Sequence, residues 1–152
     1  MDLNKLTIGD RVILLAGTGF LVASLLPWYA AEFTLDYLEF LNGLDYLITG
    51  VVPVVLVALT MGVVLLTRFA DLQLPELPLP LSQVLIAPPG VAAVLVFFRL
   101  LLGDGLDGID LSRRFGLFLA LLTAIGVCVG AFLKMQEDDG TPTHGSTPPQ
   151  PF

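Results

Sequence analysis

The chain has 152 residues and a formal net charge of −7 at pH 7, and its composition is 55% hydrophobic and only 14% charged. A soluble domain usually has about a quarter of its residues charged, and one soluble core of this length could not bury so much apolar surface. The acidic balance argues against a nucleic-acid partner, and the single cysteine excludes an intrachain disulfide and a cysteine metal cluster.

Four stretches contain no Asp, Glu, Lys or Arg: 12–31, 46–67, 77–98 and 115–133. A hydrocarbon core about 30 Å thick needs roughly 20 apolar helical residues, and unpaired backbone groups cannot face lipid. The sequence therefore predicts an all-α membrane protein. We expect a four-transmembrane-helix bundle with helices at about 8–29, 44–69, 81–102 and 111–135.

A short amphipathic N-terminal segment is predicted to lead into the first helix. Thr7 and Asp10 have the spacing of a capping box, with Asp in place of the usual Glu, which predicts a helix start near Ile8. A cleaved signal peptide is disfavoured because the uncharged run exceeds a usual h-region. In addition, Tyr29 occupies the −3 position of the only plausible cleavage site, after Ala31.

The stretch SLLPWYAAEF at 24–33 closes the first apolar run. Trp and Tyr are enriched at membrane interfaces because their rings are apolar while their N–H and O–H groups bind water. We therefore predict that Trp28 and Tyr29 form an interfacial anchor at the helix exit. The following segment, 29–45, predicts a short helix lying on the membrane surface.

Prolines interrupt the second and third predicted helices. Pro53 predicts a kink or a loosened turn, which neighbouring helices can tolerate. Pro88 and Pro89 disfavour helical angles in the residues before them. Either 81–87 is a bent continuation of the third helix, or that helix is short and its start is shielded by protein. We favour the bent continuation.

The fourth predicted helix carries small residues four positions apart, which lie on one face and permit close helix approach. Packing within the bundle is the favoured interpretation, and association with a partner or a second copy is the alternative. These helix-packing residues form one row of Gly116, Ala120, Ala124 and Cys128, and a second row of Gly126 and Gly130.

Three arginines are candidate lipid or anion contacts: Arg99, Arg113 and Arg114. Arg99 lies near a predicted helix end, so snorkelling to the interface is favoured over an anion or coupling role. The other two end the stretch GDGLDGIDLSRR at 103–114, whose three aspartates offset them. The aspartate spacing does not fit a calcium loop, so no metal site is predicted.

The composition divides the chain into a transmembrane domain at 1–136 and a tail at 137–152 that is rich in Pro, Thr and Gly. The tail lacks a core-forming pattern and is predicted to be disordered. Two basic residues, Lys5 and Arg11, precede the first uncharged stretch, and no further one follows until Arg68. This asymmetry favours cytoplasmic N- and C-termini.

Two segments resemble small four-span membrane proteins of actinobacteria whose function is uncharacterised. They are the opening LNKLTIGDRVILLAGTGFLVASLLPWY at 3–29 and the ending RRFGLFLALLTAIGVCVGAFLKMQE at 113–137. The resemblance implies a protein of the plasma membrane with both ends inside. It implies no catalytic residue and no substrate, and the Pro88-Pro89 break departs from its pattern.

No catalytic constellation or cofactor site is predicted. The one histidine, His144, lies in the tail, and no serine has a base placed beside it. The sequence favours a non-enzymatic accessory, scaffold or oligomer-forming subunit whose partners are the lipid bilayer and a membrane protein or a second copy. The alternative is a small transporter or channel subunit that uses the proline-broken helices.

Overall fold

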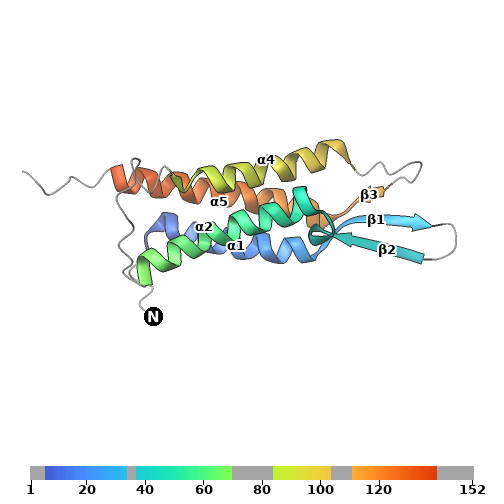
Figure 1. Ribbon diagram of the computed structural model, residues 1–152, viewed down its shortest axis with the longest axis horizontal. Coiled ribbons are helices and arrows are strands. Elements are labelled where there is room, and N and C mark those ends of the chain that lie inside the picture. The colour runs from blue at the N-terminus through green and yellow to red at the C-terminus, as the bar shows by residue number, and fades with distance from the viewer. Residues whose placement is uncertain (1–5, 34–36, 70–83, 104–110, 140–152) are drawn as a thin grey trace, which may run out of the picture.

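The computed structural model describes residues 6–33, 37–69, 84–103 and 111–139 (Figure 1). The chain is mostly helical. Its helices lie side by side along one long axis, and a small antiparallel sheet extends from one end of them (Figure 1). The elements in chain order are α1 (Ile8–Leu25), β1 (Pro27–Phe33), β2 (Tyr37–Asn42), a 3-10 turn (Gly43–Asp45), a π-helical turn (Leu47–Val51), α2 (Val52–Phe69), α4 (Ala87–Leu102), β3 (Leu111–Arg113) and α5 (Phe115–Asp139).

Within the described residues, three helical segments are long and apolar enough to cross a membrane. They are Ile8–Leu25, Leu47–Phe69 and Phe115–Glu137. The fourth helix, α4, has 16 residues. At 1.5 Å per residue it is about 24 Å long, short of a hydrocarbon core of about 30 Å. A mostly helical fold with helices long and apolar enough to cross a membrane is thus confirmed, whereas four full spans are not established.

Helix α1 begins where its capping box predicts. The Thr7 hydroxyl accepts a hydrogen bond from the Asp10 backbone N–H at 3.3 Å, and the Asp10 carboxylate accepts one from the Thr7 N–H at 3.2 Å. The helix ends at Leu25, earlier than the predicted 29. The reason is that Pro27 begins a strand, whose extended backbone cannot continue the helix.

The sheet overturns two predictions: that the chain is all-α, and that 29–45 forms a surface helix. Strand β1 pairs antiparallel with both neighbours, so the strand order is β2-β1-β3. Tyr29 lies opposite Leu41 on one side and opposite Arg113 on the other. Aromatic residues in this segment suit a pleated, half-buried surface, and the ladder satisfies backbone groups that a short surface helix would expose at its ends.

The loosened turn expected at Pro53 lies just before it, as the π-helical turn Leu47–Val51. The Val52 N–H donates to the Leu47 carbonyl there, which is the wider spacing of a π turn. Pro53 then lies in the first turn of α2, and because the helical segment Leu47–Phe69 is continuous, the N–H that this proline lacks is missing beside the irregular turn.

The two prolines expected to interrupt the third helix instead begin it, because α4 starts Ala87-Pro88-Pro89. Proline is well tolerated in the first turn, where its N–H would have no helical partner. The preceding residue, Ile86, already has helical angles (φ −76°, ψ −33°). The rest of the proposed bent continuation, at 81–83, lies outside the described residues.

The last helix also departs from its predicted bounds of 111–135. Its expected first turn is strand β3, and α5 runs from Phe115 to Asp139, past the predicted domain boundary at 136. The remaining tail, 140–152, lies outside the described residues, as does most of the predicted amphipathic N-terminal segment.

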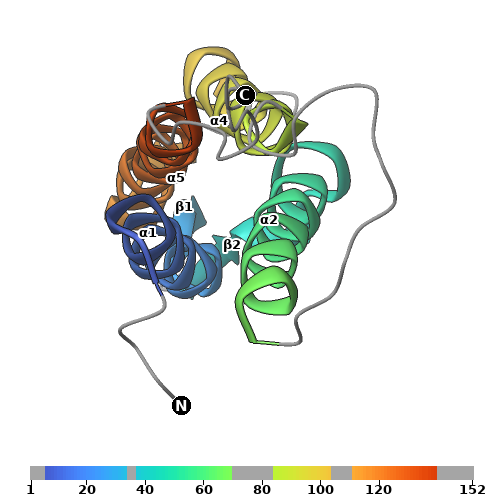
Figure 2. The same ribbon diagram turned by 90° about the vertical axis from the view of Figure 1, so that its left-hand side faces the viewer.

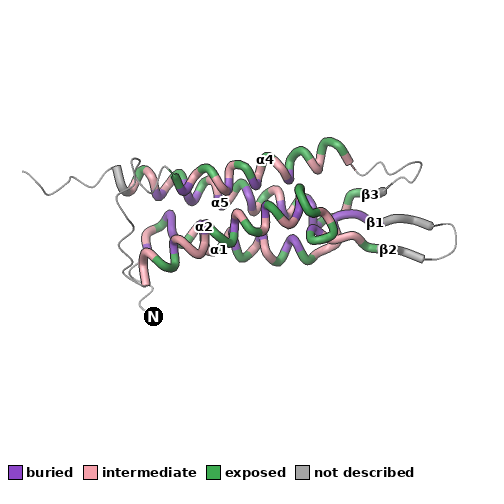
Figure 3. The backbone as a smooth tube through the Cα atoms, viewed as in Figure 1, coloured by how far each residue is buried: buried purple, intermediate pink, exposed green. Residues whose placement is uncertain are grey.

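Helices α1 and α5 make the most extensive contact in the described chain, and Figure 2 shows them side by side, with α4 beside α5 and α2 on the far side. Glycines bring the two backbones together. A Cβ atom on Gly9 would lie 2.6 Å from the backbone nitrogen of Lys134, and one on Gly130 would lie 2.8 Å from that of Ile13. Buried residues line the inside of the helices, and exposed ones cover much of the outside (Figure 3).

Candidate functional site

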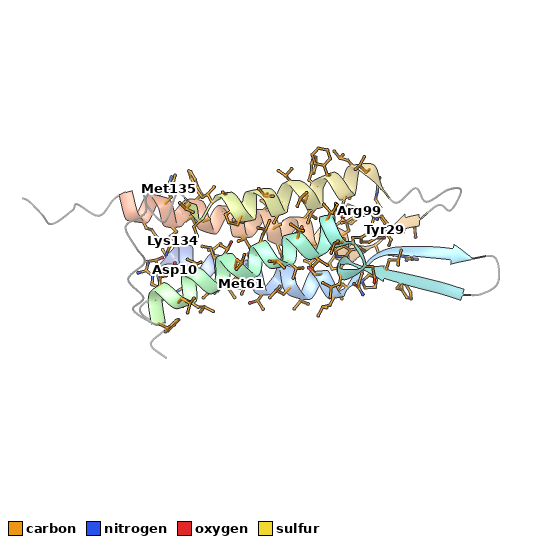
Figure 4. All side chains as sticks on the ribbon, viewed as in Figure 1. Asp10, Tyr29, Met61, Arg99, Lys134 and Met135 are labelled. Carbon is orange, nitrogen blue, oxygen red and sulfur yellow. The ribbon has the colours of Figure 1, made fainter. Side chains whose placement is uncertain are left out.

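An aromatic–arginine cluster joins the helices to the sheet; it consists of Trp28, Tyr29, Tyr46 and Arg99. Figure 4 shows Arg99 and Tyr29 pointing toward one another at this end of the molecule. The guanidinium carbon of Arg99 lies 3.7 Å from the ring centroid of Tyr46 and 5.1 Å from that of Tyr29. The Tyr29 hydroxyl donates to the backbone carbonyl of Arg99 at 2.9 Å. The end of α4 is thereby attached to β1 and to the turn before α2.

Trp28 completes this cluster from the other side. Its indole N–H donates to the carbonyl of Ala23 at 2.9 Å, and its ring stacks on Tyr46 with centroids 6.5 Å apart. Two glycines make room for these rings. A Cβ atom on Gly43 would lie 2.7 Å from the indole ring of Trp28, and one on Gly50 would overlap the carbonyl oxygen of Gly43. The tight path of the chain between β2 and α2 therefore depends on glycine.

The structure corrects the interfacial-anchor assignment of Trp28 and Tyr29. Both side chains are fully buried, although consecutive strand residues normally face opposite sides; the strand register shifts between Pro27 and Tyr29, at Trp28. An anchor must contact the interface, and a side chain without exposed area cannot do so. Arg99, predicted to snorkel or to contact lipid, has its guanidinium over the Tyr46 ring inside the same cluster. Cation–π contacts of this kind contribute about 0.5–2 kcal/mol.

An ion cluster closes the opposite end of the helices and consists of Asp10, Arg68 and Lys134; Figure 4 labels its first and last members. The Asp10 carboxylate has no exposed area and accepts hydrogen bonds from Lys134 Nζ and, at 2.7 Å, from Arg68 Nε. The Gly9 backbone N–H donates to Glu137 Oε1 at 3.2 Å. The cluster joins the start of α1 to the ends of α2 and α5.

The sequence analysis missed this ion cluster as a site, although one signal pointed to it. Asp10 and Lys134 stand at opposite ends of apolar helices, which an antiparallel arrangement brings to the same end of a bundle. A buried carboxylate with two cationic partners is a structural ion pair when no further reactive group adjoins it. The arrangement indicates that the ion cluster holds the ends of the helices together.

The described hydroxyl groups offer no activated nucleophile. Those of Ser24, Thr60 and Thr123 donate to backbone carbonyls one turn earlier in their own helices. Within the described ranges, no three His, Cys, Asp or Glu side chains are grouped so that they could hold a metal ion. His144 and the three aspartates of 104–110 lie outside those ranges.

The remaining predicted site residues lie on the sheet, at the start of α5 and along α5. Arg113 is an exposed residue of β3, and Arg114 follows it, with its backbone N–H donating to the Trp28 carbonyl at 2.8 Å. Among the small residues of α5, Gly116, Ala120, Ala124 and Gly130 are buried, whereas Gly126 and Cys128 are half-buried.

A second set of small residues lies on the outside of α2. Ala58 and Gly62 line an apolar groove of about 320 Å³ together with Val55, Leu59, Val63 and Leu66. A Cβ atom added to Gly62 would meet nothing within 4 Å. The groove is therefore open at Gly62.

Comparisons with protein-family models, with curated proteins and with solved structures found no match for this chain. The class of protein is therefore defined by the fold, the aromatic–arginine cluster and the ion cluster alone. It is a mostly helical protein with three helices long and apolar enough to cross a membrane and a small antiparallel sheet at one end.

Proposed function

We propose that the protein is a non-enzymatic integral membrane protein that acts as an accessory or scaffold subunit. In this proposal the helices lie in the plasma membrane, and the sheet is presented outside the bilayer to a protein partner. Both chain ends are then cytoplasmic. The start of α1 and the end of α5 lie at the same end of the molecule, away from the sheet, which is compatible with that orientation (Figure 1).

Membrane embedding is supported by the outer surfaces of the helices. Large apolar side chains are exposed there, among them Leu15 at 77%, Leu59 at 59% and Leu122 at 67%. A helical bundle in water would place charged and polar side chains on those faces. Exposed leucines at mid-helix positions are suited to lipid instead.

The observation that carries the scaffold role is the direct attachment of the sheet to the two most closely packed helices. Only Leu26 separates α1 from β1, and only Arg114 separates β3 from α5. Because β1 pairs with β3, the helix pair continues into a strand pair. The aromatic–arginine cluster fills the junction. A sheet built this way is held rigidly, and its outer strands offer edges to which a partner can add a strand.

The test is site-specific photo-crosslinking in native membranes. A photoreactive residue replaces Ser112, which is exposed on β3, and in a matched control it replaces Leu122, which is exposed at mid-helix on α5. We expect one stoichiometric protein adduct from position 112 and only lipid adducts from position 122. Purification in mild detergent should then recover the same partner.

Two results would contradict this proposal. The absence of a stoichiometric adduct at 112 removes its central claim. Solute flux through reconstituted vesicles that disappears when Pro53 or Arg99 is replaced would instead support the transporter alternative. With a further photoreactive residue placed on α2, a self-adduct that is lost in Gly62→Leu would indicate a homo-oligomer; this substitution is suitable because a Cβ atom at Gly62 meets open space in the single chain.

A further inference from the structure

An apolar pocket lies where the sheet meets the helices, between strand β2 and the start of α5. Its volume is about 210 Å³, and its surface is almost wholly apolar. Arg114 borders the pocket, but its guanidinium is not exposed on that surface and its Nε atom is buried. The pocket therefore suits a hydrocarbon occupant. The lining residues are Leu26, Pro27, Phe40, Arg114, Phe115 and Gly116.

Two phenylalanines contribute exposed rings to this pocket. Phe40, on β2, is 53% exposed, and Phe115, the first residue of α5, is 72% exposed. If the junction of sheet and helices stood clear of the bilayer, both rings and the apolar lining between them would face water. Apolar surface in water is unfavourable in proportion to its area, so contact with hydrocarbon would stabilise this part of the molecule.

The length of α5 places the pocket at the edge of the hydrocarbon core. At the other end of the helices, the ion cluster contains Lys134 and the Arg68 side chain, which is 30% exposed, so that end must reach a membrane–water interface. From Lys134 to Phe115 the helix rises about 28 Å, close to the hydrocarbon thickness of about 30 Å. Phe115 therefore lies at the opposite edge, and Phe40 reaches the same level because it lines the same pocket.

The pocket is continuous with the surface that the helices would present to lipid. Phe115 belongs both to the pocket and to the segment Phe115–Glu137, which is long and apolar enough to cross a membrane. Leu25, the last residue of α1, is exposed and directly precedes the lining residue Leu26. Lipid that covers these helix ends lies directly beside the pocket, whereas a protein occupant would first have to displace it.

We propose that the pocket takes the upper part of one phospholipid acyl chain from the leaflet on the sheet side, so that strand β2 contacts the bilayer at Phe40. The proposal rests on the membrane embedding proposed above but not on any protein partner. Apolar burial alone holds the chain, so the site accepts phospholipids of any headgroup. The base of the sheet is thereby fixed at the membrane interface, and the outer part of the strands stays free for recognition.

The test measures lipid contact at tryptophans added to the full-length protein in phosphatidylcholine vesicles. The acyl chains carry bromine, which quenches tryptophan on contact, either near the glycerol or near the chain end. Phe40→Trp keeps an aromatic ring in the pocket. Ser112→Trp is the matched control, because Ser112 and Phe40 both lie opposite Ala30 in the sheet but only Phe40 lines the pocket. Leu122→Trp reports the middle of α5, and the fully buried Trp28 gives a background that is measured in the parent.

We expect bromine near the glycerol to remove most of the emission that Phe40→Trp adds, and bromine near the chain end to remove less. The emission added by Ser112→Trp should persist with both lipids. Leu122→Trp should be quenched more strongly by bromine near the chain end, because it lies deeper in the bilayer. If Phe40→Trp does not fold, Leu26→Trp, which adds its ring to the same pocket, replaces it with the same expected loss.

The outcomes separate this inference from the embedding on which it rests. Quenching at position 122 without quenching at position 40 would overturn the acyl-chain site and leave the embedding intact. No quenching at either position would overturn both. Equal quenching at positions 40 and 112 would show that the whole end of the sheet lies in lipid, which would also overturn a site confined to the pocket.

Discussion

Gly130 is the position at which the packing of the two central helices is most directly testable. A Cβ atom placed there would lie 2.8 Å from the backbone nitrogen of Ile13, about 0.6 Å short of the 3.4 Å at which ordinary van der Waals contact begins. A second contact, to Ile13 Cγ1, is also 2.8 Å. The Ile13 side chain can change its conformation, but the backbone of α1 at Ile13 cannot move without separating the helices. We therefore expect Gly130→Ala to destabilise the protein.

Gly62→Ala is the matched control for the size of the loss in unfolding free energy. Both substitutions exchange glycine for alanine inside a helix, which by itself favours the helix by about 1 kcal/mol. A Cβ atom on Gly62 meets nothing within 4 Å, so only the variant at Gly130 adds overpacking, which typically costs about 1–3 kcal/mol. The difference in free energy of unfolding between the two variants should then be about 1–3 kcal/mol, because the helix preference cancels.

The assay is equilibrium unfolding of both variants and the parent in one detergent, followed by far-UV circular dichroism. Gly62→Ala should unfold at or above the denaturant concentration of the parent, and Gly130→Ala below it. If the two variants unfold together, the close approach of α1 and α5 at Gly130 does not contribute as argued, and the packing account is wrong.

Two further substitutions test the two clusters. Asp10→Asn should lower the free energy of unfolding by about 3–5 kcal/mol, because it leaves Lys134 buried without its anion. The double variant with Lys134→Met should recover part of that loss. A double variant less stable than Asp10→Asn would refute the pairing. Gly50→Ala should lower the thermal midpoint more than any other glycine substitution named here, because its Cβ overlaps the Gly43 carbonyl oxygen; an unchanged midpoint would show that the turn before α2 is not closed as described.

Features that depend on residues close together in the chain were predictable. The capping box of α1 needs only Thr7 and Asp10, three residues apart, and the structure has both of its hydrogen bonds. The length and apolar character of the first, second and last helices follow from local composition. Pro53 predicted a kink or a loosened turn within the second helix, and the π-helical turn lies directly before it.

Features that depend on distant residues were not predictable. The segment after Trp28 has a pattern compatible with a surface helix, and it is a strand because its partners are available on both sides. One of those partners, β3, lies far along the chain, beyond α2 and α4, and its Arg113 is opposite Tyr29. Arg99 similarly meets Tyr29 only because α4 ends beside β1.

The sequence by itself determined that the chain forms long apolar helices of membrane-spanning length, because uncharged stretches of about 20 residues are visible residue by residue. Only the tertiary structure decided which side chains meet. It turned Trp28 inward and joined Asp10 to Lys134 across 124 residues of chain. The physical reason is that helices of similar composition can pack in many registers, and only the glycine contacts, the strand ladder and the buried polar pairs select one.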